Sequence, residues 1–439
     1  MDRREFLKSS SGLLFGATAL GGLASYFPTN ILASNNPLTS EPHFFLTIRL
    51  QEGLDNIFGL NPWTADFPNQ ENLFLGENYQ VLQNTLGTDI NLGPSALALE
   101  KHVHDIAIIN GVFMGPVDIG HPAALHYMTS AQTDPQKVHF ITELAENLRQ
   151  YKQENEGSIL VKGDLRIAHL KQINRAPLEE LSNMIVGKDG NFSLDKFTSS
   201  QIGTSKFSEI FKKVDSNKEK MKLMKNKLAE IAVDKNTPTE DELIAAAFAA
   251  DAYRFAQIDI FNQGVDAHSN FFSTHPQAQK ELWTRVSKLF DKLKSLTYLD
   301  TDEALFPNYV TVLVITEFSR LPFLNSARGK DHNFFDNSVL LAGKGIKGGT
   351  QVGDHHLFVK DDKHPVSQLS GVHIDYLTGE TVKNSYYNTK FVDNISSTRH
   401  VDLIRPSNVY RTLAEIFQVD YRYLKAVNQN DKIIPEILA

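Results

Sequence analysis

The chain has 439 residues, of which 41% are hydrophobic, and this is enough to build the core of an enzyme-sized domain. It contains no cysteine, which excludes disulfides and thiolate metal sites, so any metal ion would bind to oxygen and imidazole ligands. The net charge is -8, and no stretch has the basic density of a nucleic-acid-binding surface, so we expect no nucleic-acid partner.

The N-terminal residues have the pattern of an export signal. Arg3 and Arg4 are adjacent and are followed by Phe-Leu-Lys and by an apolar run at 12–23. This pattern is typical of a signal read by the twin-arginine translocase, and it predicts a signal peptide at residues 1–33 and a periplasmic or secreted protein. The alternative is a membrane anchor, but the run is shorter than the roughly 20 apolar residues that a span needs. We expect no stable membrane span after signal removal, and whether the signal is cleaved stays open.

Short apolar runs, rich in β-branched and aromatic residues, follow a polar linker and indicate buried strands. In chain order they lie at 43–50, 105–110, 158–161, 309–316 and 338–342. Amphipathic helices are predicted between them, including one at 277–294 and one that begins at a Ser407 cap. Strands that alternate with helices favour a single α/β domain over 34–439 with a largely parallel sheet.

A helical insertion is predicted at about 170–261. Its middle part, 211–234, is rich in lysine and has apolar residues at helical spacing. The sequence from Thr239 to Glu242 resembles a capping box that opens a second helix, which we expect to run towards Phe261. The lysines form either a binding face or the solvated side of a helix, and a charge run of this kind favours the second interpretation.

Polar side chains cluster near the ends of the predicted strands, where open α/β sheets bind their ligands. Four clusters lie there, at 51–56, 120–126, 317–320 and 329–333, and a fifth, at 266–269, opens a predicted helix. Asp, Glu and His are the ligands of zinc and of hard divalent cations, and loops that end buried strands can direct them at one point. The sequence therefore predicts a shared polar site, although each Asp-His pair taken alone is more typical of a surface or capping pair.

Three phrases within these clusters resemble a known family. They are VDAHSNFFSTHPQ at 265–277, ITEFSRLPFLNSARGKDHN at 315–333 and LLAGKGIKGGTQVG at 340–353. They look like the family called domain of unknown function 1501, which is related to the alkaline phosphatase and sulfatase superfamily. The resemblance covers most of the chain after the signal and is strongest over 262–353.

The resemblance implies an alkaline phosphatase-like, doubly wound α/β sheet with helices on both faces. Active members of that superfamily hold divalent metal ions (zinc, magnesium or manganese, or a single calcium) and act on phosphate or sulfate esters. By position, the resemblance implies metal ligands at Asp55, Asp266, His268, Glu317, Asp331 and His332. His275 is the alternative to His268, and His121 is predicted to be a catalytic acid/base or a further ligand.

The sequence departs from the superfamily at the nucleophile. The comparable stretch, 115–122, has no hydroxyl side chain, and Thr129 and Ser130 lie two turns further along a predicted helix. Phe318 also occupies a ligand position and cannot coordinate a metal. Two functions therefore stay open: a metal-dependent hydrolase-like protein that acts on phosphate or sulfate esters, and a non-catalytic exported protein that binds an anionic small molecule or carbohydrate, or assembles with a partner.

Two smaller features have structural alternatives. The glycine-rich run at 343–349 is predicted to be a tight turn rather than a phosphate cradle, although Lys344 or Lys347 would then be free to neutralise an anion at the rim. Arg320 is predicted to pair with Glu317 or with a substrate anion.

Overall fold

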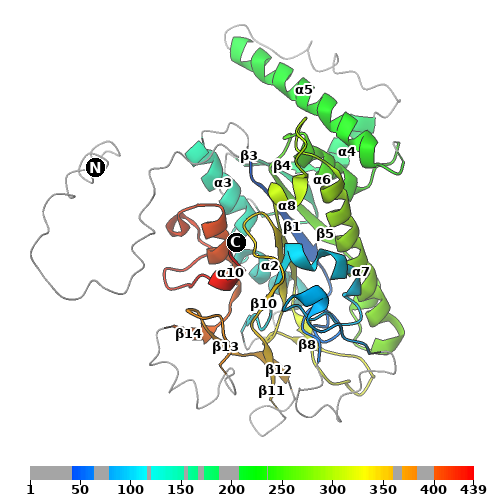
Figure 1. Ribbon diagram of the computed structural model, residues 1–439, viewed down its shortest axis with the longest axis vertical. Coiled ribbons are helices and arrows are strands. Elements are labelled where there is room, and N and C mark those ends of the chain that lie inside the picture. Colours follow the sequence, from blue (N-terminus) through cyan, green and yellow to red (C-terminus); the bar gives the residue numbers. More distant parts are fainter. Residues whose placement is uncertain are drawn as a thin grey trace, which may run out of the picture. The chain divides into compact units, whose positions relative to one another are not determined.

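The computed structural model describes residues 42–63, 79–115, 120–152, 157–166, 173–186, 207–234, 236–358, 368–382 and 400–439 (Figure 1). The predicted signal peptide lies outside the described residues, as does 116–119, which is part of the stretch compared with the superfamily's nucleophile. Within the described ranges, no helix has the length and apolar character that crossing a membrane requires.

An eight-stranded sheet forms the centre of the fold. Its strands are β1 (Phe44–Leu50), β2 (Ile106–Ile109), β3 (Gly157–Lys162), β4 (Ile173–Pro177), β5 (Phe255–Ile260), β6 (Val310–Thr316), β9 (Val339–Gly343) and β10 (Thr350–Val352). Their order is β10-β2-β9-β6-β1-β5-β3-β4, and only the two pairs that contain β9 are antiparallel. The other seven strands therefore end at the same edge, which we call the carboxyl edge.

Three small antiparallel pairs and a set of helices complete the described structure. The pairs are β7 (Ser319–Arg320) with β8 (His332–Asn333), β11 (His355–Phe358) with β12 (Gln368–Gly371), and β13 (His373–Asp375) with β14 (Val401–Leu403). The α-helices are α2 (Gly120–Ser130), α3 (Phe140–Lys152), α4 (Leu178–Val186), α5 (Phe207–Ile231), α6 (Glu240–Ala249), α7 (Phe271–Ser295), α8 (Leu305–Asn308) and α10 (Pro406–Ile416). The 3-10 helices are η2 (Thr85–Gly87), η3 (Leu97–Asp105), η5 (Gln263–Val265), η6 (Tyr421–Tyr423) and η7 (Pro435–Ile437).

Strand β1 lies between β5 and β6, and all seven of its residues are buried. Successive side chains point to opposite faces of the sheet, so Leu46 and Ile48 join one hydrophobic cluster while Phe45 joins the other. This is why β1 reads as a continuous apolar run rather than an alternating one.

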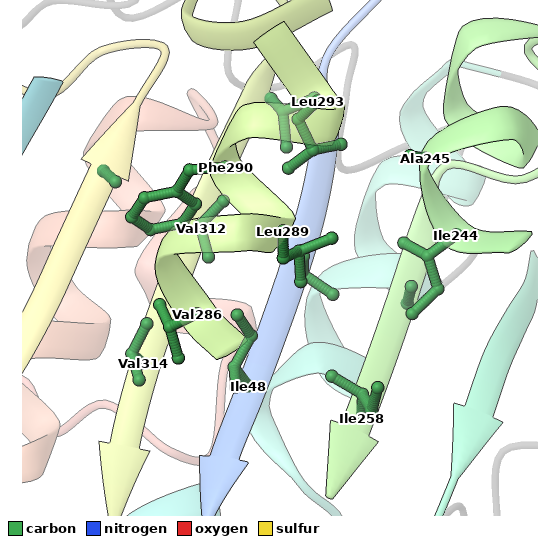
Figure 2. Packing of buried hydrophobic residues seen from close by; sticks show 14 of the residues in the cluster. Ile48, Ile244, Ala245, Ile258, Val286, Leu289, Phe290, Leu293, Val312 and Val314 are labelled. Atoms are coloured by element: carbon green, nitrogen blue, oxygen red, sulfur yellow. The ribbon is translucent and has the colours of Figure 1, made fainter. Parts of the chain in front are cut away.

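Helices cover both faces of the sheet. On one face α6, α7 and η3 pack on β1, β5 and β6, and Figure 2 shows Val286, Leu289 and Phe290 of α7 against Ile48 and Val312. On the other face lie α2, α3 and α10, with their own buried cluster. Burying a side chain of this size contributes roughly 1.5–3 kcal/mol, so both clusters hold the sheet in place. The predicted fold class, an α/β fold with a largely parallel sheet and helices on both faces, is confirmed.

The region predicted as a helical insertion contains two strands of the sheet, which corrects its boundaries. The capping box is present, because Thr239 Oγ1 accepts from Glu242 N at 3.4 Å and Glu242 Oε2 accepts from Thr239 N at 2.8 Å. The helix it opens ends at Ala249, however, and Phe255 begins β5 between β1 and β3. An alanine-rich run precedes β5 without a proline or glycine, so the sequence alone suggested a longer helix.

The lysine-rich helix α5 packs on the body through its C-terminal half. Met224 and Leu228 are buried there. Lys220 Nζ donates to Asp251 O at 2.6 Å, and Lys227 Nζ donates to Thr297 Oγ1 at 3.0 Å. These two lysines therefore anchor the helix, whereas Lys222 is exposed.

The start of α10 differs from the predicted one. The helix begins at Pro406, and the residue before it, Arg405, is the N-cap. Asn408 Oδ1 accepts from Arg405 N at 2.9 Å, and a proline at the first helical position needs no hydrogen-bonded N–H. Ser407, the predicted cap, lies inside the helix.

Candidate metal centre

The polar segments predicted from the sequence meet at the carboxyl edge. Glu52 follows β1, and Asp266 and His268 lie between β5 and α7. Glu317 follows β6 directly, and His332 is in β8. These segments lie up to 280 positions apart in the sequence, and the parallel order of β5, β1 and β6 brings them together.

Four side chains direct one ligand atom each at a common point. They belong to His121, Asp266, His268 and His332, and their ligand atoms all lie within 4.8 Å of one another. The His268 Nε2 atom is 3.1 Å from His332 Nε2 and 3.2 Å from Asp266 Oδ1, and His121 Nε2 is 3.7 Å from Asp266 Oδ1. A tetrahedral ion with bonds of 2.0–2.1 Å separates its ligand atoms by about 3.3 Å, so the three shorter distances match such an ion, whereas a separation near 4.8 Å would have to shorten when the ion binds.

Two carboxylates fix the orientation of two of these imidazoles. Glu317 Oε2 is 2.6 Å from His121 Nδ1, and Asp331 Oδ1 is 2.8 Å from His268 Nδ1. With the Nδ1 proton on the carboxylate side, each Nε2 lone pair points inward, as in the carboxylate–histidine pairs behind bound metals. The structure thus places Glu317 and Asp331, both predicted as ligands, behind the histidines rather than in the inner group.

A buried guanidinium connects the segments that carry these residues. The side chain of Arg320 is 0% exposed. Its Nη2 donates to Asp266 Oδ1 at 2.8 Å and to Glu52 O, Nε donates to Gly53 O at 3.1 Å, and Nη1 donates to Lys330 O at 3.1 Å. Burial opposes ionisation of Asp266, but the hydrogen bond and charge of Arg320 outweigh it and lower the pKa of Asp266. Arg320 thus pairs with Asp266 and not with Glu317, the predicted partner within the chain.

Asp55 lies apart from the four ligand atoms and already has a cation. Its Oδ2 accepts from Lys330 Nζ at 2.5 Å, and its Oδ1 accepts from Ile57 N at 2.9 Å and from Phe58 N at 3.3 Å. The two side chains are 0% and 1% exposed, and Lys330 Nζ lies 4.6 Å from the centroid of the Phe271 ring. The predicted ligand role of Asp55 is therefore corrected to one half of a buried ion pair, because an ammonium group takes the place next to it.

His275, the sequence alternative to His268, is a buried structural residue. Its Nδ1 is 2.6 Å from Val265 O and its Nε2 is 2.7 Å from Gln279 Oε1. Burial lowers the pKa of His275 to about 4. Gln279 in turn bonds Asp55 N and Asp55 O, both at 2.9 Å, so these residues fix the start of α7 against the loop after β1.

Glu52 lies in the predicted polar cluster 51–56 but was not predicted as a site residue. Its Oε2 lies 3.6 Å from His121 Nδ1, and burial, together with the charges of Glu317 and Asp266, raises its pKa. The hydrogen bond to Glu317 also raises the pKa of His121, against the effect of burial. Glu52 has φ 79, and a non-glycine residue in this region is typical of strained functional loops. The signal in the sequence was its position at the strand end, three residues before Asp55.

Phe318 forms the apolar floor of the centre. Its ring centroid lies 4.9 Å from that of His121 and 4.1 Å from that of His332. Gly53 packs on the same ring with φ +71, and a Cβ at this position would lie 2.2 Å from Phe318 Cε2. Phe318 cannot coordinate an ion, as predicted, but it supports two of the imidazoles that can.

The two hydroxyl side chains that follow the expected nucleophile position, two turns further along, form hydrogen bonds within α2. Thr129 Oγ1 donates to Leu125 O at 2.8 Å, and Ser130 Oγ donates to His126 O at 2.7 Å. Both therefore close back on α2 instead of pointing at the imidazole cluster.

The glycine-rich run lies at the opposite edge of the sheet. Lys344 N donates to Val310 O at 2.9 Å, at the start of β6, and Lys347 N donates to Ile437 O at 2.8 Å. The run contains a tight turn in which Gly345 has φ +77. The turn interpretation is confirmed, and a role for these lysines at the rim of the centre is excluded.

Comparison with known proteins gives one family match. A model described as a protein of unknown function (DUF1501) matches residues 179–390. A search among curated protein sequences finds no match to the chain.

Several solved structures show weak similarity. The lipoteichoic acid synthase LtaP from Listeria monocytogenes is 8% identical over 72% of this chain and 69% of that chain, with a TM-score of 0.33. The lipooligosaccharide phosphoethanolamine transferase A (EptA) from Neisseria meningitidis is 8% identical over 71% and 51%, with a TM-score of 0.30. A 2-O GAG sulfatase is 10% identical over 89% and 76%, with a TM-score of 0.33.

The family match covers the segments that carry Asp266, His268, Glu317, Asp331 and His332. The resemblance seen in the sequence is thus confirmed as similarity to the DUF1501 family over residues 179–390.

Proposed function

We propose that this chain is a metal-dependent, hydrolase-like protein that holds one divalent ion between His121, Asp266, His268 and His332 and acts on phosphate or sulfate esters. The observation that carries the proposal is the convergence of these four ligand atoms within 4.8 Å of one another. Glu317 and Asp331 support it, because each orients one of the imidazoles through Nδ1.

The donor set favours zinc, with manganese as the second choice. Imidazole suits zinc and other transition metals, whereas magnesium and calcium prefer carboxylate, carbonyl and water oxygens. A single ion is favoured because Lys330 already neutralises Asp55, the carboxylate that a second ion would have used.

A bound ion would supply Lewis-acid polarisation of an ester oxygen. Around it, Glu317 keeps the proton of His121 on Nδ1, and Arg320 keeps Asp266 ionised and in place. Phe318 closes the floor of the centre. The side chains of Asp266 and His268 are 34% and 46% exposed, so a substrate approaches the cluster from their side.

Export through the twin-arginine translocase to the periplasm or the exterior belongs to the same proposal. It is supported by the adjacent Arg3 and Arg4 and by the apolar run at 12–23. Fractionation of cells that produce wild-type chain or a chain with both arginines changed to lysine tests it. Retention of the lysine variant inside the cytoplasm is expected, and equal export of both chains contradicts it.

The second candidate function is an exported binding or assembly protein on the same fold. It is favoured by the engagement of the Thr129 and Ser130 hydroxyls within α2. Under this function the centre binds its ion and an anionic or carbohydrate ligand without turnover.

Elemental analysis combined with activity on aryl phosphates and aryl sulfates tests both functions. We expect one zinc ion per wild-type chain, loss of the ion in His268→Ala, and full retention in the control His104→Ala, which removes an exposed histidine from η3. A folded wild-type protein without any metal contradicts the proposal. A bound ion without turnover of any ester favours the second function.

A further inference from the structure

The candidate centre contains more carboxylates than the single one, Asp266, that belongs to the ligand group. Beside the ligand Asp266, three carboxylates surround the imidazoles: Glu52, Glu317 and Asp331. Their oxygens lie 3.6, 2.6 and 2.8 Å from the nearest imidazole nitrogen. All four carboxylates are therefore close enough to act on the charge of a bound substrate.

Few cations among the described residues balance them. Arg320 is buried and pairs with Asp266, whereas the charge of Lys330 is already matched by Asp55. Arg328, on the loop beside His268, is exposed, and solvent screens its charge. Four carboxylates against one divalent ion and one guanidinium leave one negative charge in excess when the imidazoles are neutral.

We propose, on the basis of the proposed function, that this excess selects esters whose reacting group carries a single negative charge. Sulfate monoesters and phosphodiesters belong to this class. Phosphate monoesters do not, because their second pKa is about 6 and they are dianions at pH 8. The second charge of a phosphate monoester would be placed among carboxylates that no further cation neutralises.

Glu52 is the residue through which the selection can be altered. It is outside the group of four ligand atoms, its carboxylate is 3.6 Å from His121 Nδ1, and no lysine or arginine among the described residues forms an ion pair with it. Removing its charge in Glu52→Gln is expected to raise kcat/KM for a phosphate monoester about tenfold relative to a monoanionic ester. A single charge at about 5 Å in a partly exposed site has an effect of this size.

The experiment uses the zinc-loaded full chain at pH 8 with 4-nitrophenyl sulfate, bis(4-nitrophenyl) phosphate and 4-nitrophenyl phosphate. We expect the wild type to favour one of the first two, and which of them is faster identifies the ester chemistry. The control Asp300→Asn removes an equal charge from an exposed turn at the opposite edge of the sheet and is expected to leave the ratio unchanged.

A second measurement avoids substitution altogether. Rising salt concentration weakens repulsion, so kcat/KM for the phosphate monoester is expected to rise more steeply with salt than that for the two monoanions. A wild-type preference for the phosphate monoester, or an unchanged ratio in Glu52→Gln, overturns the inference while a bound zinc ion leaves the proposed function intact. Absence of metal, or turnover of none of the three esters, overturns the hydrolase proposal and the inference together.

Discussion

Asp55 and Asp266 follow neighbouring parallel strands, and the sequence gives them the same predicted role. In the structure Asp55 is 0% exposed and pairs with Lys330, whereas the side chain of Asp266 is 34% exposed and faces His121 and His268. Both carboxylates have a cation from the chain, Lys330 for Asp55 and Arg320 for Asp266, but only Asp266 also lies among imidazoles that could hold a metal ion. A carboxylate at a strand end is therefore a candidate ligand, but the groups packed around it determine whether it can bind a metal ion.

The largest expected effect comes from breaking the closed pair. Lys330→Met leaves Asp55 as a buried charge without a partner, and this is expected to lower the free energy of unfolding by about 3–5 kcal/mol. Chemical denaturation measures the change. The double variant Lys330→Met/Asp55→Leu replaces the pair by apolar groups and is expected to recover most of the loss. A single variant as stable as the wild type would show that the pair is not closed.

Glu143 on α3 extends the comparison to a buried carboxylate on which burial outweighs the charges of Lys425 and Lys137. It accepts from Ala426 N at 3.0 Å, and burial raises its pKa from 4.5 to about 7. The folded chain therefore holds this proton more tightly than the unfolded chain, so the free energy of unfolding falls as pH rises from about 4.5 to about 7. Glu143→Gln is expected to remove this fall and to gain up to about 3 kcal/mol at pH 8.

Thermal or chemical denaturation of wild type and Glu143→Gln at pH 4.5 and pH 8 checks this prediction. The two proteins are expected to differ little at the lower pH, where the carboxyl group is protonated in the folded chain and about half protonated in the unfolded chain. An equal difference at both pH values would contradict a raised pKa.

The role of the two orienting carboxylates in the candidate centre can be tested by removing them one at a time. Glu317→Gln weakens the bond that fixes His121 and is expected to reduce zinc affinity 10- to 100-fold, without a comparable loss of stability. Asp331→Asn acts in the same way on His268, but a smaller loss is expected because the Asp331 side chain is 48% exposed. Competition with a chelator of known affinity measures the zinc affinity of both variants. An unchanged affinity in both would show that Glu317 and Asp331 do not support metal binding.

The smallest effects concern two helix starts that look alike in the sequence. Thr239 caps α6 with its side chain, so Thr239→Ala is expected to cost about 1 kcal/mol of the free energy of unfolding. Ser407 lies inside α10 and does not cap it, so Ser407→Ala is expected to cost less. Equilibrium denaturation compares them, and the reverse order would contradict the observed caps.

Much of the fold was predictable because buried strands have a local signature. The predicted strands at 43–50, 158–161 and 309–316 agree with β1, β3 and β6 within one or two residues. Strand β5 was missed because the alanine-rich segment before it continues a helical pattern, and only its position between β1 and β3 makes it a strand. Long-range pairing thus overrode local propensity there.

The candidate centre was predictable as a set of segments but not as a set of roles. Asp266, His268 and His332 were named as ligands, and the structure brings their ligand atoms together with that of His121. Glu317 and Asp331 were named alongside them, yet each contacts an imidazole Nδ1. No spacing rule distinguishes these two positions, since a residue that binds an ion and a residue that orients its ligand have the same chemistry.

Composition and local periodicity were enough to locate most strand ends, the residue types near them and the exclusion of thiolate ligands, but not the end of β5, which precedes Asp266. The order of the strands and the cation next to each carboxylate depend on long-range contacts and are seen only in the folded chain. The physical cause is that an ion pair such as Asp55 with Lys330 joins positions 275 residues apart. A local sequence pattern contains no information on which distant side chain will form the pair.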